Sequence, residues 1–342
     1  MTIRILEALR GQRTPTLPVW FMRQAGRSLP EYQQARKDIK MLDSCLMPEL
    51  AAEITLQPVR RHNVDAAIFF SDIMVPLRLA GVDVDIAPGV GPVLGSPIRS
   101  RQDVKNLPTP TFDDAGMIAE AIRLIRAELP TDKTLLGFAG APFTLAAYMV
   151  EGRPSKDHLR ARALMYSDPT TWNTLLSWCA TVSNLFLRVQ IEAGAQGVQL
   201  FDSWAGSLSR TAYETYVLPY SRRTLEEITV PRIHFGTYTN QFLDLMAHGF
   251  EAVGVDHRTP LDEAARLVPD TVLQGNIDPA LLFAGQDALH AHALDVVRRG
   301  LAAPAHIVNL GHGVPPTTDP GVLTELVAFL HDIEIDKLTE EE

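Results

Sequence analysis

Cysteine is scarce in this sequence, and metal-binding patterns are missing. Cys45 and Cys179 are the two cysteines in 342 residues, and they form neither a CxxC pair nor part of a His/Cys cluster at ligand spacing. So few cysteines in a chain of this size exclude a disulfide framework. We therefore expect two free, buried thiols in a reducing compartment and no metal site.

Long apolar runs and an excess of basic residues are also absent. No segment approaches the ~18 consecutive apolar residues that a membrane-spanning helix needs. The polar first residues, MTIRILEALRGQ, do not fit a secretory signal. The formal net charge of −10 argues against a nucleic-acid partner but is compatible with an anionic small ligand held by a local arginine cluster. We expect a cytoplasmic protein that binds neither membranes nor nucleic acid.

The motifs of three large enzyme classes do not occur. There is no G-x-S-x-G elbow, which weakens a hydrolase interpretation although Ser, His and Asp are all present. No G-x-G-x-x-G follows an expected strand, and no G-x-x-x-x-G-K-[ST] loop occurs. Dinucleotide binding and P-loop chemistry are therefore disfavoured.

Short apolar runs that end in turn residues recur along the chain, with helical patterns between them. Eight such strands are predicted, at 18–22, 65–70, 134–138, 197–201, 232–235, 252–256, 271–274 and 306–310. Helices are predicted within 48–63, 115–129, 169–193, 260–268, 281–301 and 320–332. This alternation favours a single-domain (β/α)8 TIM barrel over residues 1–342. A doubly wound sheet is the alternative, since it also buries such runs.

Two segments depart from this alternation. Residues 82–98, VDVDIAPGVGPVLGSPI, alternate and are rich in glycine and proline, which predicts a hairpin-like excursion after the second strand. The charged residues 336–342 are expected to form a frayed acidic tail. No internal repeat or low-complexity tract interrupts the pattern.

The stretch PVWFMRQAGRSLPEYQ, residues 18–33, places two arginines four residues apart at the mouth of the first predicted strand. A guanidinium is always charged, and its planar fork matches carboxylates. Surface solvation or a structural ion pair is the ordinary role of an arginine. The glycine between the two arginines and the proline beyond them indicate a shaped loop rather than a solvated helix face.

Further polar residues follow other predicted strands, where the catalytic groups of a barrel gather. Asp72 follows the second strand, Tyr148 and Ser203 follow the third and fourth, and His312 follows the last between two glycines. Structural alternatives remain open. Asp72 could cap a helix or pair with Arg78, Tyr148 could be a core residue, and Ser203 could cap a helix. Asp202 could compete with Asp72 for an acid–base role.

Five motifs together resemble the uroporphyrinogen decarboxylase family. They are MRQAGRSLPEY, FFSDIM, GFAGAPFTLAAYMVEG, FDSWAG and NLGHGVPP, and their order also fits the family, from about residue 18 to residue 316. The resemblance implies a single-domain (β/α)8 fold, in agreement with the barrel predicted above. It also implies that the four acetate carboxyls of uroporphyrinogen III are removed to give coproporphyrinogen III and CO2 in heme biosynthesis. The reaction would need no metal or other cofactor.

The resemblance further implies roles for the predicted site residues. Asp72 would accept the pyrrole N–H groups and stabilise the cation formed when the ring is protonated. One arginine would be the proton donor, although a guanidinium is a poor acid. The substrate-binding loop would consist of Arg23 and Arg27 together with the backbone of Gln24, Ala25 and Gly26. The residues lining the cavity, contacting substrate carboxylates or supporting Asp72 would be Ile68, Phe70, Tyr148, Phe201, Ser203 and His312.

Two alternatives to this reaction stay open. Relatives with this fold include corrinoid-dependent methyltransferases, which generally need a zinc site with His and Cys ligands, and neither Cys45 nor Cys179 lies in such a cluster. A non-catalytic tetrapyrrole binder would keep the arginines but would not need Asp72. The resemblance also implies a homodimer, for which the sequence itself gives no sign.

Overall fold

A curled parallel sheet forms the centre of the computed structural model, which describes residues 3–26, 28–112, 115–335 and 338. In this part of the chain the sheet contains seven strands, β1 (Ala66–Ile68), β4 (Thr134–Gly140), β5 (Gly197–Asp202), β6 (Arg232–Gly236), β7 (Ala252–Gly254), β8 (Val272–Ile277) and β9 (His306–Leu310). Their order in the sheet follows the chain without reversal, and every neighbouring pair is parallel. This order rules out the doubly wound alternative, which requires a reversal.

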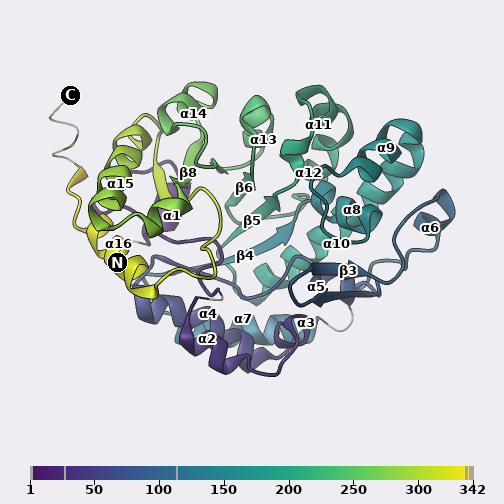
Figure 1. Cartoon of the computed structure of the whole chain (residues 1–342), viewed down its shortest axis with the longest axis horizontal. Coiled ribbons are helices and arrows are strands. Elements are labelled where there is room, and N and C mark those ends of the chain that lie inside the picture. Colours follow the sequence, from purple (N-terminus) through teal and green to yellow (C-terminus); the bar gives the residue numbers. More distant parts are fainter. Residues whose placement is uncertain (1–2, 27, 113–114, 336–337, 339–342) are drawn as a thin grey trace.

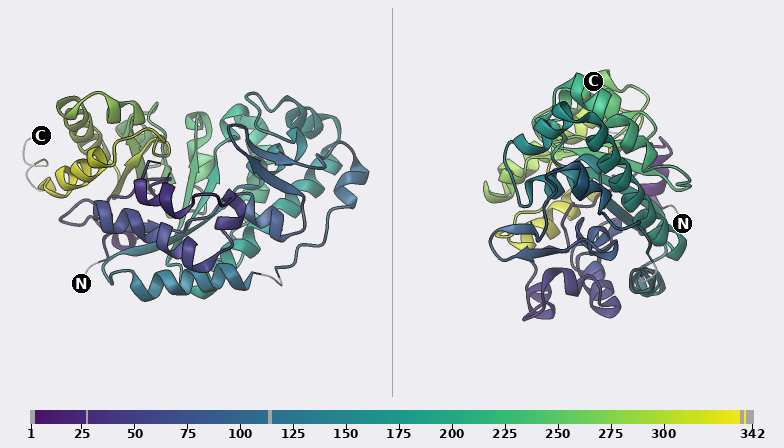
Figure 2. Two further views of the ribbon diagram at one scale, coloured as in Figure 1. Left: turned by 60° about the horizontal axis from the view of Figure 1, so that its bottom comes forward. Right: turned by 90° about the vertical axis from the view of Figure 1, so that its right-hand side faces the viewer.

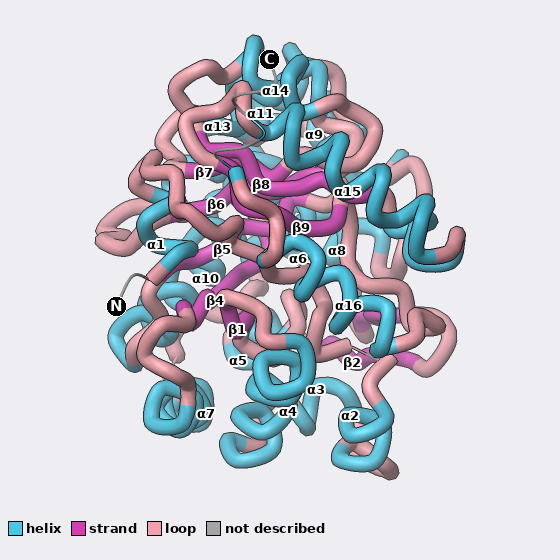
Figure 3. The backbone as a smooth tube through the Cα atoms, turned by 90° about the vertical axis from the view of Figure 1, so that its left-hand side faces the viewer, coloured by secondary structure: helices cyan, strands magenta, loops and turns pink. Residues whose placement is uncertain are grey.

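Helices surround this sheet on its outer side (Figures 1 and 3). The longer ones are α4 (Pro48–His62), α7 (Gly116–Glu128), α8 (Pro142–Glu151), α9 (Leu159–Ser167), α10 (Pro169–Ala193), α15 (Gln286–Gly300) and α16 (Pro320–His331). The shorter ones are α1 (Arg4–Leu9), α2 (Pro30–Ala35), α3 (Met41–Ser44), α5 (Val75–Leu79), α6 (Arg101–Lys105), α11 (Arg210–Tyr216), α12 (Leu218–Arg223), α13 (Leu243–Ala247) and α14 (Leu261–Leu267).

Local sequence signals set the ends of the predicted helices. Pro48 is the first residue of α4, and Asn63 ends this helix in the left-handed conformation at φ 54°. Asp168 caps α10 by accepting a hydrogen bond from the Thr171 N–H at 3.1 Å. The ranges predicted for α4, α7, α10, α14 and α16 agree with the structure to within one residue at each end, and the range 281–301 contains α15.

Residues 18–22, predicted as the first strand, do not form one. Val19 makes a single parallel bridge with Val308 of β9, and on its other side its carbonyl accepts the Asp65 N–H at 2.7 Å. The ladder ends there because side chains take the next backbone donors: Phe21 N–H bonds Gln24 Oε1, and Met22 N–H bonds Asn309 Oδ1. The segment therefore lies between β9 and the start of β1 without completing an eighth strand.

A polar chain crosses the interior of the curled sheet. Trp20 Nε1 donates to Gln274 Oε1 at 3.0 Å, and Gln274 Nε2 donates to Gln199 Oε1 at 2.9 Å. The chain links the 18–22 segment to β8 and β5, which are not neighbours in the sheet. All three side chains are buried, and the two bonds satisfy the Trp20 N–H and the Gln274 side chain, whereas Gln199 Nε2 has no partner among the described residues.

The excursion predicted at 82–98 is a hairpin. Strands β2 (Val84–Ala87) and β3 (Gly91–Leu94) pair antiparallel and stand apart from the parallel sheet (Figure 2). The Leu94 N–H donates to the Gly152 carbonyl at 2.9 Å, which ties the hairpin to the end of α8. The tail predicted at 336–342 lies outside the described residues, apart from Leu338.

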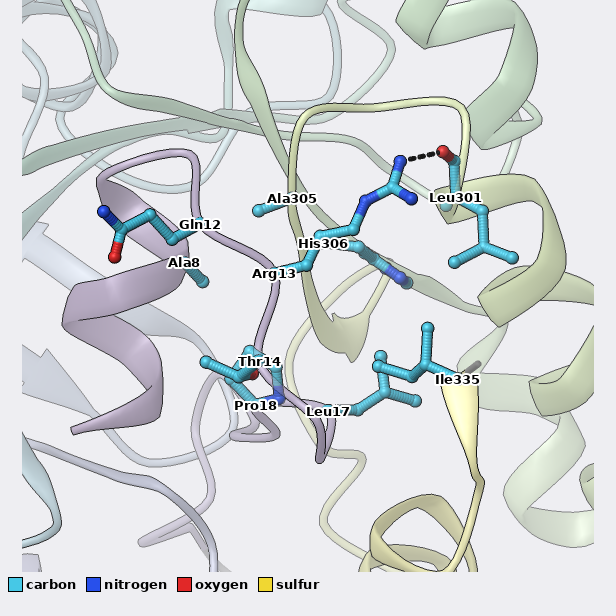
Figure 4. Close-up of a pocket in the computed structure, with 11 residues that line it drawn as sticks. Ala8, Gln12, Arg13, Thr14, Leu17, Pro18, Leu301, Ala305, His306 and Ile335 are labelled. Atoms are coloured by element: carbon cyan, nitrogen blue, oxygen red, sulfur yellow. Dashed lines mark hydrogen bonds between the residues drawn. The ribbon is translucent and has the colours of Figure 1, made fainter. Parts of the chain in front are cut away.

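A small pocket lies at the N-terminal end of the parallel strands, next to the start of β9 (Figure 4). The Arg13 guanidinium reaches across it to the Leu301 and Ala303 carbonyls, at 2.6 and 3.0 Å. His306 lies beside it and donates through Nε2 to the Gly275 carbonyl at 2.6 Å. The Arg13 guanidinium and His306 Nε2 thus bond to backbone carbonyls, whereas His306 Nδ1 has no partner in the part of the chain that the structure describes.

Two predictions about the chain as a whole can be compared with the structure. Cys45 and Cys179 are free and buried, as predicted, and burial raises the pKa of both thiols. Among the described residues, no helix combines the length and hydrophobicity that a membrane span requires.

Candidate active site

Asp72 lies in the loop that connects β1 to α5, just past the C-terminal end of β1. Its Oδ1 accepts a hydrogen bond from the Met74 N–H at 2.9 Å, which shapes the turn into α5. Arg78, its alternative partner, instead pairs with Asp43 at 2.8 Å. Burial raises the pKa of Asp72 above the usual value, and the Met74 N–H and the Arg23 charge oppose this shift.

Arg23 occupies a conformation that depends on two nearby glycines. Its own backbone is left-handed, at φ 59°. A Cβ on Gly26 would lie 2.3 Å from the Arg23 carbonyl oxygen, and a Cβ on Gly313 would lie 2.5 Å from Arg23 Cδ. Glycine at both positions therefore lets the arginine pack between its own loop and the segment after β9. Arg27, the second predicted arginine, lies outside the described residues.

The Gln24 side chain holds the arginine loop in place. Its Oε1 accepts the Phe21 N–H at 3.0 Å, and its Nε2 donates to the Ala66 carbonyl at 2.8 Å. Because Gln24 is 1% exposed and both ends of its amide are bonded, its side chain is not available to a ligand. A contact with substrate at this position would have to use backbone atoms.

Tyr148 of α8 belongs to the same electrostatic neighbourhood as Asp72 and Arg23. Burial raises the pKa of Tyr148 to about 12, the Asp72 charge adds to this shift, and Arg23 opposes it. The phenol is therefore protonated at neutral pH and can donate a hydrogen bond. Its ring meets the Trp204 ring edge-on, with centroids 5.1 Å apart.

His312 follows β9 and lies close enough to Arg23 to be affected by its charge. Burial lowers the pKa of His312 to about 4, and the charges of Arg23 and His257 add to this shift. The imidazole is therefore neutral at neutral pH. The charge of Arg258 also lowers the pKa of His312. The Arg258 guanidinium stacks over the Tyr238 ring, 3.8 Å from the ring centroid. Arg23 thus connects the end of β9 with the Asp72 side of the site.

The predicted apolar residues lie at the same edge of the sheet. Ile68 ends β1 and is buried, and Phe70 packs edge-on against Tyr32 at 5.8 Å. Phe201 of β5 meets Phe138 of the neighbouring strand β4 at 5.5 Å, again edge-on. These side chains form apolar walls near the ends of β1, β4 and β5.

Asp202, the last residue of β5, and Ser203, which follows it, lie in different environments. The Ser203 carbonyl accepts a hydrogen bond from the Thr237 hydroxyl at 2.8 Å, which ties it to the end of β6. Asp202 is fully buried, and its Oδ1 accepts from the Thr144 hydroxyl at 2.9 Å. Asp202 therefore has no surface open to a ligand, whereas Asp72 is only partly buried.

Two parts of this site were not among the predicted site residues. Trp204 follows Ser203 directly, but its contact with Tyr148 joins two elements and cannot be inferred from spacing. Asp256, His257 and Arg258 follow β7 and lie near His312. Their signal was available, because three polar residues in a row follow an apolar run.

A parallel sheet with basic, acidic and phenolic side chains at the C-terminal ends of its strands is the arrangement of an enzyme that acts on a small molecule. A family model described as "Uroporphyrinogen decarboxylase (URO-D)" matches residues 2–333. A uroporphyrinogen decarboxylase of Arthrobacter sp. (strain FB24) is 59% identical over 96% of both chains. One of Streptomyces avermitilis is 55% identical over 95% of this chain and 93% of its own. The chain therefore belongs to the uroporphyrinogen decarboxylase family.

Similar solved structures share the fold at low sequence identity. A methyltransferase from Methanosarcina mazei superposes with a TM-score of 0.80 at 18% identity, covering 96% of this chain and 97% of the other. A B12-independent methionine synthase from Shewanella sp. W3-18-1 gives a TM-score of 0.59 at 13% identity, covering 85% and 88%. At these identities the similarity establishes the fold alone.

Proposed function

We propose that the protein is a uroporphyrinogen decarboxylase that converts uroporphyrinogen III to coproporphyrinogen III and four molecules of CO2. The observation that carries this proposal is the convergence of Arg23, Asp72, Tyr148 and His312 at one edge of the sheet. It occurs in a chain more than half identical to relatives of that name over almost its full length.

The chemistry of the substrate accounts for this set of residues. Protonation of a pyrrole carbon creates an iminium-like cation, and the carbon–carboxylate bond then breaks as its electron pair enters the ring. CO2 leaves, the exocyclic carbon takes up a proton to become a methyl group, and the ring carbon loses its added proton. Each acetate consumes one proton overall. Because the protonated ring is itself the electron sink, the reaction is proposed to need no metal or other cofactor.

Asp72 is the proposed counter-charge for this cation. A partly buried carboxylate stabilises positive charge more strongly than one in water, because the surrounding dielectric is lower. Pyrrole N–H groups that donate to it would favour its ionised form and offset the effect of burial on its pKa. The neutral His312 and the protonated Tyr148 would bond substrate carboxylates or Asp72 itself.

Arginine provides the proposed grip on the substrate carboxylates. Arg23 and Arg27, with the backbone of Gln24, Ala25 and Gly26, would hold acetates or propionates through planar two-point bonds. Ile68, Phe70 and Phe201 would line the ring cavity, and Ser203 would contact a carboxylate. The guanidinium proton donor stays a hypothesis to be tested by substitution.

The remaining sequence-based expectations extend this proposal. We propose that the chain is a single-domain, TIM-barrel-like enzyme in which the 18–22 segment takes the place of the eighth strand. One cluster of buried apolar side chains extends from Ile5 to Ile335, which supports a single domain. A homodimer in the cytoplasm is proposed from the family resemblance.

The direct test is an anaerobic incubation of purified, metal-free protein with uroporphyrinogen III. Oxidation and separation of the porphyrins by carboxyl number should give a ladder from eight carboxyls down to four. Tight binding with an unchanged octacarboxylate would instead identify a tetrapyrrole carrier. A reaction that starts only when a metal is restored would contradict the cofactor-free mechanism.

A further inference from the structure

A hydrogen-bonded chain joins helix α8 to the end of strand β5 behind the candidate active site. The Thr144 hydroxyl donates to Asp202 Oδ1 at 2.9 Å. The oxygen of that hydroxyl, Thr144 Oγ1, also accepts a hydrogen bond from the Trp204 N–H at 3.4 Å. Thr144 and Asp202 are both fully buried. One hydroxyl group therefore binds both the carboxylate that ends β5 and the backbone just after it.

Thr144 and Asp202 lie close in sequence to Tyr148 and Trp204. Tyr148 lies four residues after Thr144 in α8, so the two side chains project from the same face of that helix. Trp204 lies two residues after Asp202, and its ring meets the Tyr148 ring at 5.1 Å and 90°. The Thr144 bonds thus fix the two backbones whose side chains form the Tyr148–Trp204 contact.

His234 lies beside Asp202 in the interior of the protein. His234 Nδ1 lies 3.1 Å from the Met246 carbonyl, which can only accept, so Nδ1 carries a hydrogen. His234 Nε2 then faces Asp202 Oδ2 at 3.8 Å, and neither atom has a hydrogen-bond partner among the described residues. Both side chains are fully buried, so a substitution at position 202 must also suit His234.

We propose that Thr144 and Asp202 are positioning residues, which hold Trp204 against Tyr148 and so aim the Tyr148 hydroxyl toward the Asp72 end of the site. This inference rests on the proposed function, since it assigns a role within the same reaction. Asp202 acts through its bond to Thr144 and not as an acid or base. Its charge is not required, provided that position 202 can still accept from Thr144 and satisfy His234.

The first test compares Thr144→Val, which keeps the shape of the side chain but loses the hydroxyl, with Thr144→Ser, which keeps the hydroxyl. In the anaerobic porphyrinogen assay, Thr144→Val should lower kcat by about ten- to a hundredfold with a small change in KM, since misplacement of about 1 Å can cost that much. Thr144→Ser should retain most of the activity.

Amide hydrogen exchange supplies a readout that does not depend on turnover. The Trp204 N–H should exchange faster in Thr144→Val and at the wild-type rate in Thr144→Ser, while amides in β9 stay unchanged in both. Wild-type kcat together with wild-type Trp204 exchange in Thr144→Val would overturn the proposal. If Thr144→Val does not fold, Thr144→Ala replaces it with the same expectations.

The second test is Asp202→Asn, which separates positioning from direct chemistry. The asparagine oxygen can accept from Thr144, and its NH2 can donate to the lone pair of a neutral His234. We expect this variant to stay active and to keep the Trp204 amide protected. An inactive Asp202→Asn with a protected Trp204 amide would show that the charge itself is needed and would overturn the proposal.

These tests also separate the two levels of inference. If the wild-type protein produces no porphyrin ladder, the proposed function fails, whereas the exchange measurement still reports on the Thr144 bonds. If the wild type is active and the Thr144 variants behave alike, the positioning role fails and the proposed function stands.

Discussion

Two aspartates flank strand β1, and they differ in how many groups bond to their carboxylates. Asp65 precedes the strand and is bonded by Arg4 at 2.8 Å, His331 at 2.8 Å, the Val19 N–H at 2.9 Å and Lys133 at 3.4 Å. Asp72 follows the strand, and its bond within the described residues comes from the Met74 N–H of its own loop.

The pKa shifts record this difference. Burial acts to raise the pKa of Asp65, but the bonds and charges of His331 and Lys133 outweigh it and hold the pKa below the usual value. Burial dominates at Asp72, whose pKa is raised. The carboxylate at the N-terminal end of the strand is therefore used for stability, and the one at the C-terminal end keeps capacity for a ligand.

Asp72→Asn should give the largest effect on function. The amide oxygen can still accept from Met74, so the loop and the fold should persist, but the negative charge opposite the substrate cation is lost. We expect turnover to fall by about 10²- to 10³-fold, the range seen when one transition-state electrostatic contact is removed. Steady-state kinetics with a melting curve on the same sample measures both parts. Wild-type turnover would contradict the assigned role.

Asp65→Asn should give the mirror result, a loss of stability with little loss of activity per folded molecule. Removing one charge from a buried network leaves Lys133 and Arg4 without their partner and should lower the free energy of unfolding by about 3 kcal/mol. Asp43→Asn is the matched control, because its pair with Arg78 is exposed and should contribute under about 1 kcal/mol. Urea unfolding compares the two. Equal losses in both variants would remove the contrast between the two carboxylates.

Stability should fall as the pH drops from about 6.5 to about 4. Burial lowers the pKa to about 4 for four histidines, which are His62, His158, His306 and His312. In this pH window these histidines are protonated in the unfolded chain but neutral in the folded protein, so lowering the pH favours unfolding. The effect stops once the histidines are protonated in both states. Each histidine contributes up to about 2 kcal/mol by pH 5.

His306→Gln tests this at one histidine, at the N-terminal end of the sheet. Glutamine can still donate to the Gly275 carbonyl but does not titrate. Its unfolding free energy should therefore depend on pH less steeply than that of the wild type, by about one proton at most. Chemical unfolding at pH 7, 6 and 5 measures the slope. Parallel slopes for the two proteins would mean that His306 titrates normally in the fold.

Gly313→Ala should give the smallest effect and one confined to the site. The new methyl group would lie 2.5 Å from Arg23 Cδ, so the arginine must move away from its packed position. We expect KM to rise about fivefold with kcat nearly unchanged, because a substrate grip is weakened without loss of chemistry. Gly116→Ala is the control, since no atom lies within 4 Å of its new Cβ. An unchanged KM would place Arg23 outside the binding site.

The seven strands that form were predictable because each is a buried apolar run that ends in a turn. The run at 18–22 has the same pattern and still fails to form a strand. Its backbone donors are taken by Gln24 and Asn309, two side chains 3 and 287 residues away from their partners. A local pattern carries no information about such competition.

The site was predicted in part for a similar reason. Asp72, Tyr148 and His312 follow strands, and the rule that active sites lie at the C-terminal ends of barrel strands brought them together. The backbone of Gln24 was predicted to be part of the substrate-binding loop, but the inward turn of its side chain, which holds that loop, was not predicted. The direction of a loop side chain depends on contacts with a second element, here the Ala66 carbonyl, which spacing does not reveal.

The single bridge between Val19 and Val308 has a consequence for how the protein is made. Val19 and Val308 lie far apart in the sequence, so the 18–22 segment emerges from the ribosome long before β9 is synthesised. At about 5–20 residues per second, that wait is roughly 15–60 s. During this time Val19, Trp20 and Phe21, which end fully buried, have no strand to pack beside on the β9 side. The nascent chain should therefore expose this short apolar segment until β9 has been synthesised.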